Sequence, residues 1–129
     1  MGATATRRIE LGIGVWNPYN RHPSLIAMET GSLDAVTQGR TAIGIGSGLS
    51  AAIKQLGIDN SKPIAALRDT FTIVRGLLRG EMVTHKGVAF AVDRIKLNFK
   101  PPRTDVPLLM AARGPQALAL CGEVADGLV

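Results

Sequence analysis

LGIGV, residues 11–15, and IGIGS, residues 43–47, share a Gly-Ile-Gly core, and this repeat decides how the 129-residue sequence is interpreted. The interval between the two runs suits one β-strand, one helix and their loops, so the repeat predicts consecutive βα units. Alternation of this kind implies parallel strands joined by right-handed crossovers. The sequence therefore predicts an α/β fold.

The segments after the two runs have helical patterns. Pro23 suits a first helical turn and Gly39 suits a helix end, with Gly31 as a weak point between them. In residues 61–80, apolar side chains recur at helical steps, which predicts a helix with one buried face. The residues of that face are Leu67, Phe71, Val74 and Leu78.

The second half of the chain first interrupts the alternation of strands and helices with a hairpin and then continues it. Residues 81–99 change to a period of two around His85-Lys86-Gly87, which predicts a β-hairpin with these three residues in its turn. VPLLMAA is a continuous apolar run, typical of a strand covered on both faces, and GPQALALCGEVA, residues 114–125, predicts a short helix. We expect four parallel strands, at about residues 9–15, 41–46, 106–111 and 126–129.

Composition and charge narrow the range of functions. With 46% hydrophobic and 19% charged residues, we expect one globular domain over residues 1–129. The sequence has no membrane-length apolar run, no secretory h-region and only one cysteine, so we expect a cytoplasmic protein. The net charge is +5, but the basic residues are scattered and no nucleic-acid reader motif occurs. We therefore expect a small-molecule ligand, without nucleic acid or membrane.

Several local motifs are excluded. GIGSG, residues 44–48, lacks the third glycine of a dinucleotide fingerprint and is not a nucleophile elbow. No His, Cys, Asp or Glu grouping has metal-ligand spacing, so we expect no metal. Cys121 is expected to pack as a small apolar residue of a helix, and His85 to lie in a solvated turn. Glu29 and Asp34 are expected on helix faces, where they favour solubility.

AARGPQAL, residues 111–118, has the features of an anion site. Gly114 lets the backbone approach a ligand, and Pro115 suits the first helical turn. The unpaired amides that open a helix attract phosphate, helped here by the charge on Arg113. A helix start without a ligand is the alternative.

Four blocks of the sequence, in this order, resemble the bacterial-luciferase-like monooxygenase superfamily. The blocks are RIELGIGVWNPYNRHP, LDAVTQGRTAIGIGSG, GLLRGEMVTHKGVAF and VPLLMAARGPQALALCGEVADGLV. The pattern Asn-Pro-Tyr-Asn-Arg-His-Pro is most similar to the branch that uses the deazaflavin coenzyme F-420, which includes methylene-tetrahydromethanopterin reductase. The resemblance implies a partial TIM (β/α)8 barrel, equivalent to about the third to sixth strands, with a β-hairpin insertion.

The resemblance also implies a site. In a barrel, the carboxyl ends of the strands build the active site, so the loop GVWNPYNRHP lies at the mouth. A non-prolyl cis peptide is expected between Gly14 and Val15, behind the ring of the flavin or deazaflavin, and the cofactor phosphate is expected near Arg113. The residues assigned to the cofactor are Gly14, Val15, Asn17, Gly46, Ser47, Ala112, Arg113, Gly114 and Pro115. Those assigned to the substrate are Trp16, Tyr19, Arg21 and His22, although His22 would otherwise cap the helix that begins at Pro23. No catalytic residue is assigned.

The function implied by the resemblance is that of a flavin- or coenzyme F-420-dependent oxidoreductase, a reductase or monooxygenase that acts by hydride transfer or oxygen activation. Coenzyme F-420 or FMN would supply the reactivity, and the protein would select the ring face, anchor the phosphate and exclude water. The alternative is a non-catalytic barrel fragment that only binds a partner chain or self-associates. Four parallel strands expose two edges, so we expect a homo-oligomer or a complementing barrel chain.

Overall fold

Four parallel strands form the centre of the fold, in the order β1-β2-β5-β6. The computed structural model describes residues 1–129. The strands are β1 (Leu11–Trp16), β2 (Thr41–Gly46), β5 (Leu108–Ala111) and β6 (Gly127–Leu128). Leu11 pairs with Thr41, Ile43 with Leu108, and Leu109 with Gly127, all in parallel register. The predicted α/β class, the parallel sheet and the positions of the strands are confirmed, and β5 and β6 are shorter than expected.

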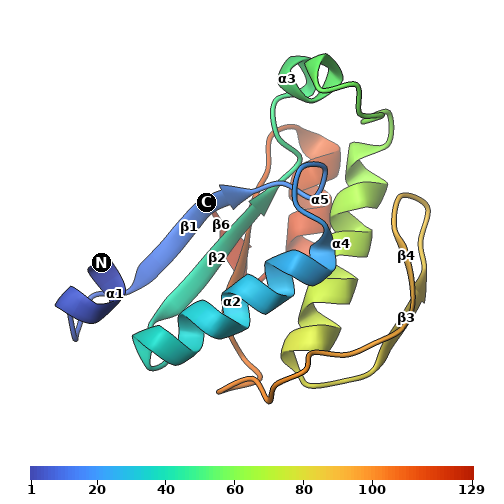
Figure 1. The fold of residues 1–129 in the computed structure, drawn as a ribbon. Coiled ribbons are helices and arrows are strands. Elements are labelled where there is room, and N and C mark those ends of the chain that lie inside the picture. Colours follow the sequence, from blue (N-terminus) through green and yellow to red (C-terminus); the bar gives the residue numbers. More distant parts are fainter.

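Three helices cover one face of this sheet (Figure 1). They are α2 (Pro23–Thr37), α4 (Pro63–Leu78) and α5 (Pro115–Val124). Each begins with a proline, which has no N–H to lose in the first turn and whose fixed φ suits a helix start. The predicted buried face of α4 is confirmed, because all four of its apolar residues belong to the core. None of the helices is long and apolar enough to span a membrane.

Two short helices were not predicted. α1 (Gly2–Ala5) precedes β1, and the guanidinium of Arg40 ties this segment down by donating to the carbonyls of Ala3, Thr6 and Ile9. α3 (Ser50–Gln55) lies in the connection between β2 and α4, beyond the carboxyl end of β2 (Figure 1). Both are too short to give a periodic apolar pattern.

The predicted hairpin forms, but its turn lies further along the chain. β3 (Val83–Lys86) pairs antiparallel with β4 (Ala91–Ile95), so His85 and Lys86 are strand residues and the turn follows them. His85 is therefore not a solvated turn residue: its Nε2 lies 2.8 Å from Oδ1 of Asp69 in α4. Asp69 is only 4% exposed, and its Oδ2 also accepts hydrogen bonds from two amides of the turn, at 2.8 and 3.0 Å. One buried carboxylate thus fastens the hairpin to α4.

Asp34 also differs from expectation, because it is fully buried instead of lying on a solvated helix face. Its carboxylate accepts two hydrogen bonds from Arg103, both at 3.0 Å, and Arg103 donates a third to the carbonyl of Thr41 at 2.8 Å. The paired charges join the end of α2, the start of β2 and the loop before β5. Glu29 is partly exposed as expected, and it pairs with Arg21 at 2.8 Å.

Gly31 and Cys121 are explained by packing. A Cβ on Gly31 would lie 2.8 Å from Cε2 of Phe99, so this glycine admits the ring against α2 and is not merely a weak point of the helix. Cys121 is buried on α5, as predicted, and is a free cysteine.

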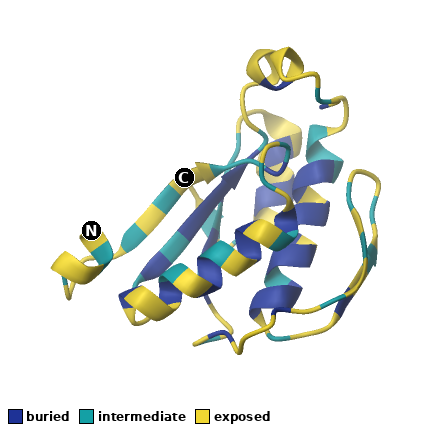
Figure 2. Cartoon of the chain, viewed as in Figure 1, coloured by how far each residue is buried: buried dark blue, intermediate teal, exposed yellow.

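The core is centred on α4 and β2. Figure 2 shows these two elements mostly dark blue, whereas β1, α3 and the hairpin are largely exposed or half-buried. Ile43 and Ile45 of β2 are fully buried in the same cluster as the helices. The buried core of α4 and β2 therefore supports the carboxyl ends of the strands.

The glycines of β2 lie on the opposite face from these isoleucines, since successive side chains alternate along a strand. A Cβ on Gly44 would lie 2.8 Å from Cγ1 of Val15, 3.0 Å from the carbonyl oxygen of Ile13 and 3.0 Å from Cγ2 of Val129. The Gly-Ile-Gly repeat therefore has a division of roles: isoleucine packs on the helices, and glycine admits neighbouring segments on the inner face.

We expect Gly44→Ala to destabilise the fold by about 1–3 kcal/mol, because the added methyl overpacks a site closed partly by backbone. Chemical denaturation monitored by circular dichroism measures the effect. Gly122→Ala is the matched control: no atom lies within 4 Å of its added Cβ, and helix propensity favours alanine by up to about 1 kcal/mol. A Gly44→Ala protein as stable as the wild type would contradict the assigned role of this glycine.

We expect Asp69→Asn to destabilise the protein at neutral pH by about 1.5–3 kcal/mol, the range for hydrogen bonds to charged groups. Burial alone would raise the pKa of Asp69, but hydrogen bonds from His85, Phe90 and Ala89 together hold this pKa below its ordinary value. A lowered folded-state pKa stabilises the fold above the unfolded carboxyl value of about 4, and this contribution is lost as pH falls through the folded value. The difference between variant and wild type should therefore shrink in acid.

Urea denaturation at several pH values measures this difference. Asp93→Asn is the control, because Asp93 is an exposed residue of β4 whose only ion pair is with its neighbour Arg94. A stability difference for Asp69→Asn that does not change with pH would show that the carboxylate charge is not what holds the hairpin.

Candidate functional site

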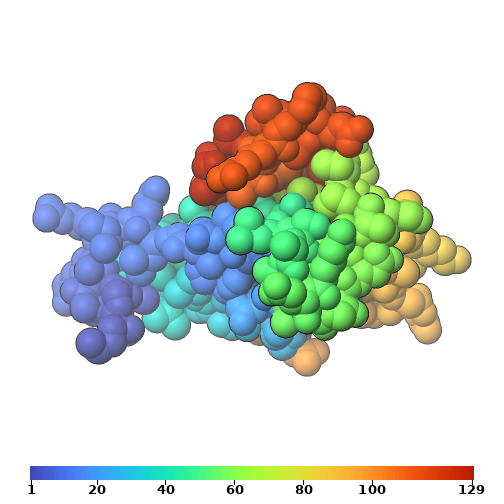
Figure 3. All heavy atoms as spheres, turned by 90° about the horizontal axis from the view of Figure 1, so that it is seen from above, coloured from blue at the N-terminus to red at the C-terminus, as the bar shows by residue number.

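A cleft of about 600 Å3 opens at the carboxyl ends of the strands. Val15 near the end of β1, Gly46 and Ser47 at the end of β2, and Ala112 and Arg113 after β5 all line it. Figure 3 shows the molecule from this end, with the C-terminal segment in red and orange on one side and the segments coloured blue to green on the other. Ligands of parallel α/β sheets bind at this end of the strands, so the cleft is the candidate functional site.

The side chain of Val15, near the end of β1, lies in the cleft. The peptide bond between Gly14 and Val15 is cis, as expected, and the register between β1 and β2 shifts between Ile13 and Trp16. Val15 lines the cleft, and a Cβ on Gly46 would lie 3.2 Å from its Cγ2. The irregular strand end thus sets one wall of the site.

Small side chains leave room beside that wall. A Cβ on Gly46 would also lie 3.1 Å from Cβ of Ala111, and Ala112 follows on the same strand end. Eight of the 13 lining residues are hydrophobic, which is typical of a pocket that holds a ring system with a few polar contacts.

The polar character of the cleft comes from two helix starts and one arginine. Pro63 at the start of α4 and Ala117 in the first turn of α5 both line it, and the first amides of each helix have no intrahelical acceptor. Gly114, the residue before α5, has a φ of +81°, a conformation that favours glycine. Arg113 is exposed and forms no ion pair with an acidic side chain. This corner of the cleft suits a phosphate group.

Four residues assigned to the cofactor do not line the cleft. Gly14 and Gly114 are each adjacent in sequence to a residue that does, and Pro115 lies between Arg113 and Ala117, two positions from each. Asn17 has a structural contact instead: its Oδ1 accepts hydrogen bonds from the amides of Tyr19 and Asn20, both at 3.1 Å. Asn17 therefore shapes the mouth loop, residues 16–22.

The residues assigned to the substrate also lie outside the cleft, and their role toward a substrate stays a prediction. The Arg21 guanidinium lies 5.1 Å from the centre of the Trp16 ring. His22 is the N-cap of α2, where its Nδ1 accepts from the amide of Ser24 at 3.2 Å, so it does cap the helix. Tyr19 lines a separate pocket.

Other residues of the cleft were missed by the sequence analysis. Leu49, Ile64, Leu67 and Val129 line it, and Leu49 is 76% exposed. Ile64 follows Pro63, which opens α4, but 16 residues that include the unpredicted α3 separate this helix start from the end of β2, so its sequence position did not indicate the cleft. Leu49 and Val129 gave no local signal.

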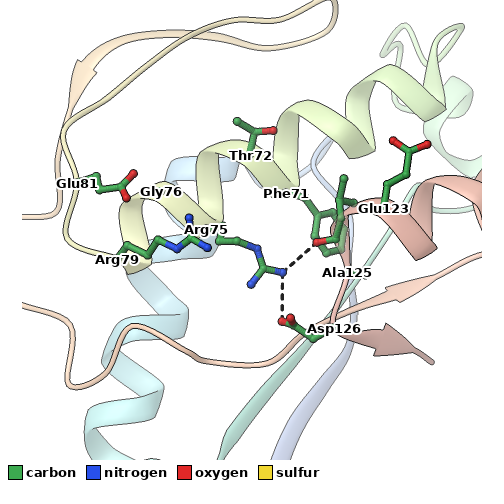
Figure 4. A pocket seen from close by; sticks show the side chains of 10 residues that line it. Phe71, Thr72, Arg75, Gly76, Arg79, Glu81, Glu123, Ala125 and Asp126 are labelled. Atoms are coloured by element: carbon green, nitrogen blue, oxygen red, sulfur yellow. Dashed lines mark hydrogen bonds and ion pairs between the residues drawn. The ribbon is translucent and has the colours of Figure 1, made fainter.

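A second pocket, of about 550 Å3, lies between α4 and the end of α5 (Figure 4). There Arg75 donates to the carbonyl of Val124 at 3.0 Å and to Oδ2 of Asp126 at 3.1 Å. Asp126 precedes β6 and accepts from the amide of Leu108, the first residue of β5. This pocket is therefore at the amino ends of the strands, where barrel residues serve stability. No group of three or more His, Cys, Asp or Glu side chains is placed to hold a metal ion.

The strand order, the helical layer and a cleft at the carboxyl ends define a partial (β/α)8 barrel. The chain belongs to the luciferase-like monooxygenase family, whose family model matches residues 1–129.

The similar proteins are longer than this chain. It is 39% identical over 127 residues to 5,10-methylenetetrahydromethanopterin reductase of Methanolobus tindarius, a match that covers 98% of the chain and 38% of the relative. It is 34% identical over 131 residues to the F420-dependent glucose-6-phosphate dehydrogenase of Beutenbergia cavernae, covering 98% of the chain and 39% of the relative. The chain therefore spans about two fifths of the length of these relatives.

A solved structure has the same fold. The coenzyme F420 dependent tetrahydromethanopterin reductase from Methanopyrus kandleri superposes with a TM-score of 0.88 at 30% identity, over 98% of this chain and 41% of that one. The expected partial barrel is confirmed by this similarity.

Proposed function

We propose that this chain carries the cofactor-binding part of a coenzyme F-420-dependent oxidoreductase that acts by hydride transfer. The observation that carries the proposal is the cleft, which gathers Val15, Gly46, Ser47, Ala112 and Arg113 from three strand ends. The names of the similar proteins support it, because two of the three are dependent on coenzyme F420 and the third shares the reductase name.

The residues of the cleft fit such a cofactor. Gly46, Ala111 and Ala112 line the cleft with no side chain or a single methyl group, so this part of it suits a flat ring. Arg113 and the first amides of α5 would hold the phosphate. Bound there, the cofactor would supply the hydride chemistry, while Val15 and the other apolar residues of the cleft would contact it and keep water away.

FMN with oxygen activation is the alternative within the same family. Both cofactors present a tricyclic ring and a phosphate, so the cleft alone suits either. We propose coenzyme F-420 because the similar proteins named above are described by that cofactor. A small-molecule substrate would then be bound beside the ring.

Titration of the protein with each cofactor tests the proposal. We expect binding to change the fluorescence of coenzyme F-420 with a lower dissociation constant than that of FMN. Tighter binding of FMN would favour a monooxygenase. Binding of neither cofactor, with a folded protein of known mass, would favour the non-catalytic barrel fragment.

We expect Arg113→Ala to weaken cofactor binding by about 1.5–3 kcal/mol, or roughly tenfold to a hundredfold, because it removes a charged donor to the phosphate. The same fluorescence titration measures the effect. Lys86→Ala removes an exposed charge of the hairpin and should leave the affinity unchanged. Equal affinities for Arg113→Ala and the wild type would remove the phosphate from this corner of the cleft.

We further propose that the edges of the sheet pair with strands of a second copy or of a complementing chain. β1 and β6 each have a strand neighbour on one side only. Leu128 and Val129 at one edge are 55% and 61% exposed, and Val15 at the other is 37% exposed. Pairing would close the mouth around the cofactor ring and reduce its contact with water.

Light scattering at micromolar concentration tests the pairing. We expect a mass above that of one chain, because unpaired strand edges and exposed apolar side chains are costly in water. A monomer with a cooperative thermal transition would contradict self-association and leave only a separate complementing chain to be sought by co-purification.

A further inference from the structure

Residues 48–60, the lid, join the end of β2 to the segment before α4. They contain α3, which projects beyond the carboxyl ends of the strands (Figure 1). Leu49 of the lid lines the cleft, although this residue is 76% exposed. An apolar side chain at the mouth of the cleft thus has little protein around it, and an occupant of the cleft would bury it.

Hydrogen bonds hold the lid to itself at both ends of α3. Nδ2 of Asn60 donates to the carbonyl oxygen of Ser50 at 3.1 Å and to its Oγ at 3.2 Å, which joins the last residue of the lid to the start of α3. Asn60 is only 9% exposed. After α3, the amide of Gly57 donates to the carbonyl of Lys54 at 2.9 Å. The lid therefore has a shape of its own, and a ligand need not order it.

The lid is joined only weakly to the rest of the molecule. Its one buried apolar side chain, Ile53, does not belong to the core cluster. Apart from the bond between Asp59 and the amide of Ser61, every hydrogen bond of the lid lies within it, and it forms no ion pair. Units with few buried apolar contacts open at a lower free energy than the core, so the lid can adjust to an occupant without disturbing the sheet.

The lid offers an apolar contact to the cleft. Of its residues, only Gly48 and Leu49 line the cleft. Its two charged side chains, Lys54 and Asp59, do not. Ile64 of α4 lines the same cleft, so Leu49 adds to its apolar lining. A ring placed against Leu49 would remove apolar surface from water, which is favourable.

We propose that the lid covers the ring of the molecule bound in the cleft, with Leu49 packed against the ring and Asn60 as the positioning residue that holds the start of α3 in place. The identity of this ring rests on the proposed function, which makes it the ring of coenzyme F-420. The contact with Leu49 adds affinity and keeps water from the part of the ring that the lid covers.

Coenzyme F-420 is the probe, and iodide reports access to its ring, because iodide quenches only a fluorophore that it can contact. Leu49→Ala should raise the dissociation constant about three- to thirtyfold, since it removes the apolar contact of the lid, and should let iodide quench the bound coenzyme more strongly. Leu56→Ala is the matched control, because Leu56 is a 61% exposed residue of the lid that does not line the cleft. It should change neither quantity.

Two variants of Asn60 test the positioning role. Asn60→Asp keeps the size of the side chain but has no N–H to donate, so it should increase iodide quenching as much as Asn60→Ala does. Both variants should keep the thermal transition of the wild type, because the lid lies outside the core cluster. A lower transition temperature with unchanged iodide quenching would show that Asn60 serves stability alone, and would overturn its positioning role.

A dye separates this proposal from the proposed function. 1-Anilinonaphthalene-8-sulfonate has apolar rings and one negative charge, and its emission rises where water is excluded. We expect its emission with the wild type to equal that with Leu56→Ala and to exceed that with Leu49→Ala. This pattern, with no binding of coenzyme F-420, would contradict the proposed function and support the lid.

Two results would overturn the proposal. Coenzyme F-420 that binds the wild type and Leu49→Ala with equal affinity and equal iodide quenching would remove the lid from the site and leave the proposed function intact. Dye emission that is equal with the wild type, Leu49→Ala and Leu56→Ala, with no binding of the coenzyme, would contradict both the lid and the proposed function.

Discussion

The close approach of Val15 and Val129 to Gly44 is the constraint on which both layers of the molecule depend. A Cβ at this position would lie 2.8–3.0 Å from atoms of Ile13, Val15 and Val129, so the ends of β1 and of the chain could not approach the inner face of β2 as closely. The residues on either side, Ile43 and Ile45, are fully buried against the helices. One six-residue strand therefore anchors the helical layer with its isoleucines and leaves the inner face open with its glycines. The cleft exists because the same alternation continues to Gly46.

The parts of the fold that sequence could predict are those whose signal is local. The Gly-Ile-Gly repeat, at an interval that suits one βα unit, predicts the first two strands. Pro23, Pro63 and Pro115 each open a helix without removing a hydrogen bond. On α4, the recurrence of Leu67, Phe71 and Val74 at helical steps needs no knowledge of any other segment. The cis peptide between Gly14 and Val15 is different, because the glycine is only compatible with it and the prediction came from the family resemblance.

The features that sequence could not predict depend on partners far along the chain. Nothing in the sequence around Asp34 indicates that this charged helix residue is buried. Its buried carboxylate is paired with Arg103, 69 residues away. His85 lies in a segment whose sequence predicts a turn, but it pairs with Val92 in the hairpin, and its side chain contacts Asp69, 16 residues away on α4. The cleft has the same property. Val15 lies near the end of β1, and Ser47 and Arg113 follow β2 and β5, so these three could be anticipated. Val129 could not, because it reaches the cleft only through the pairing of β6 beside β5.

The aromatic residues of the mouth loop support the loop itself. Arg21 lies over Trp16 while its Nη1 is held by Glu29, so the ring and the first turns of α2 are joined. His22 caps α2 and meets the Phe90 ring edge-on, with the ring centres 5.8 Å apart. Phe90 is in turn held by Asp69 through its backbone amide. Packed contacts thus run without a break from a buried carboxylate on α4, through the hairpin, to the mouth loop, which follows Val15 of the cleft. Because packed side chains transmit displacement instead of absorbing it, the hairpin belongs to the support of the cleft, although it contributes no residue to its lining.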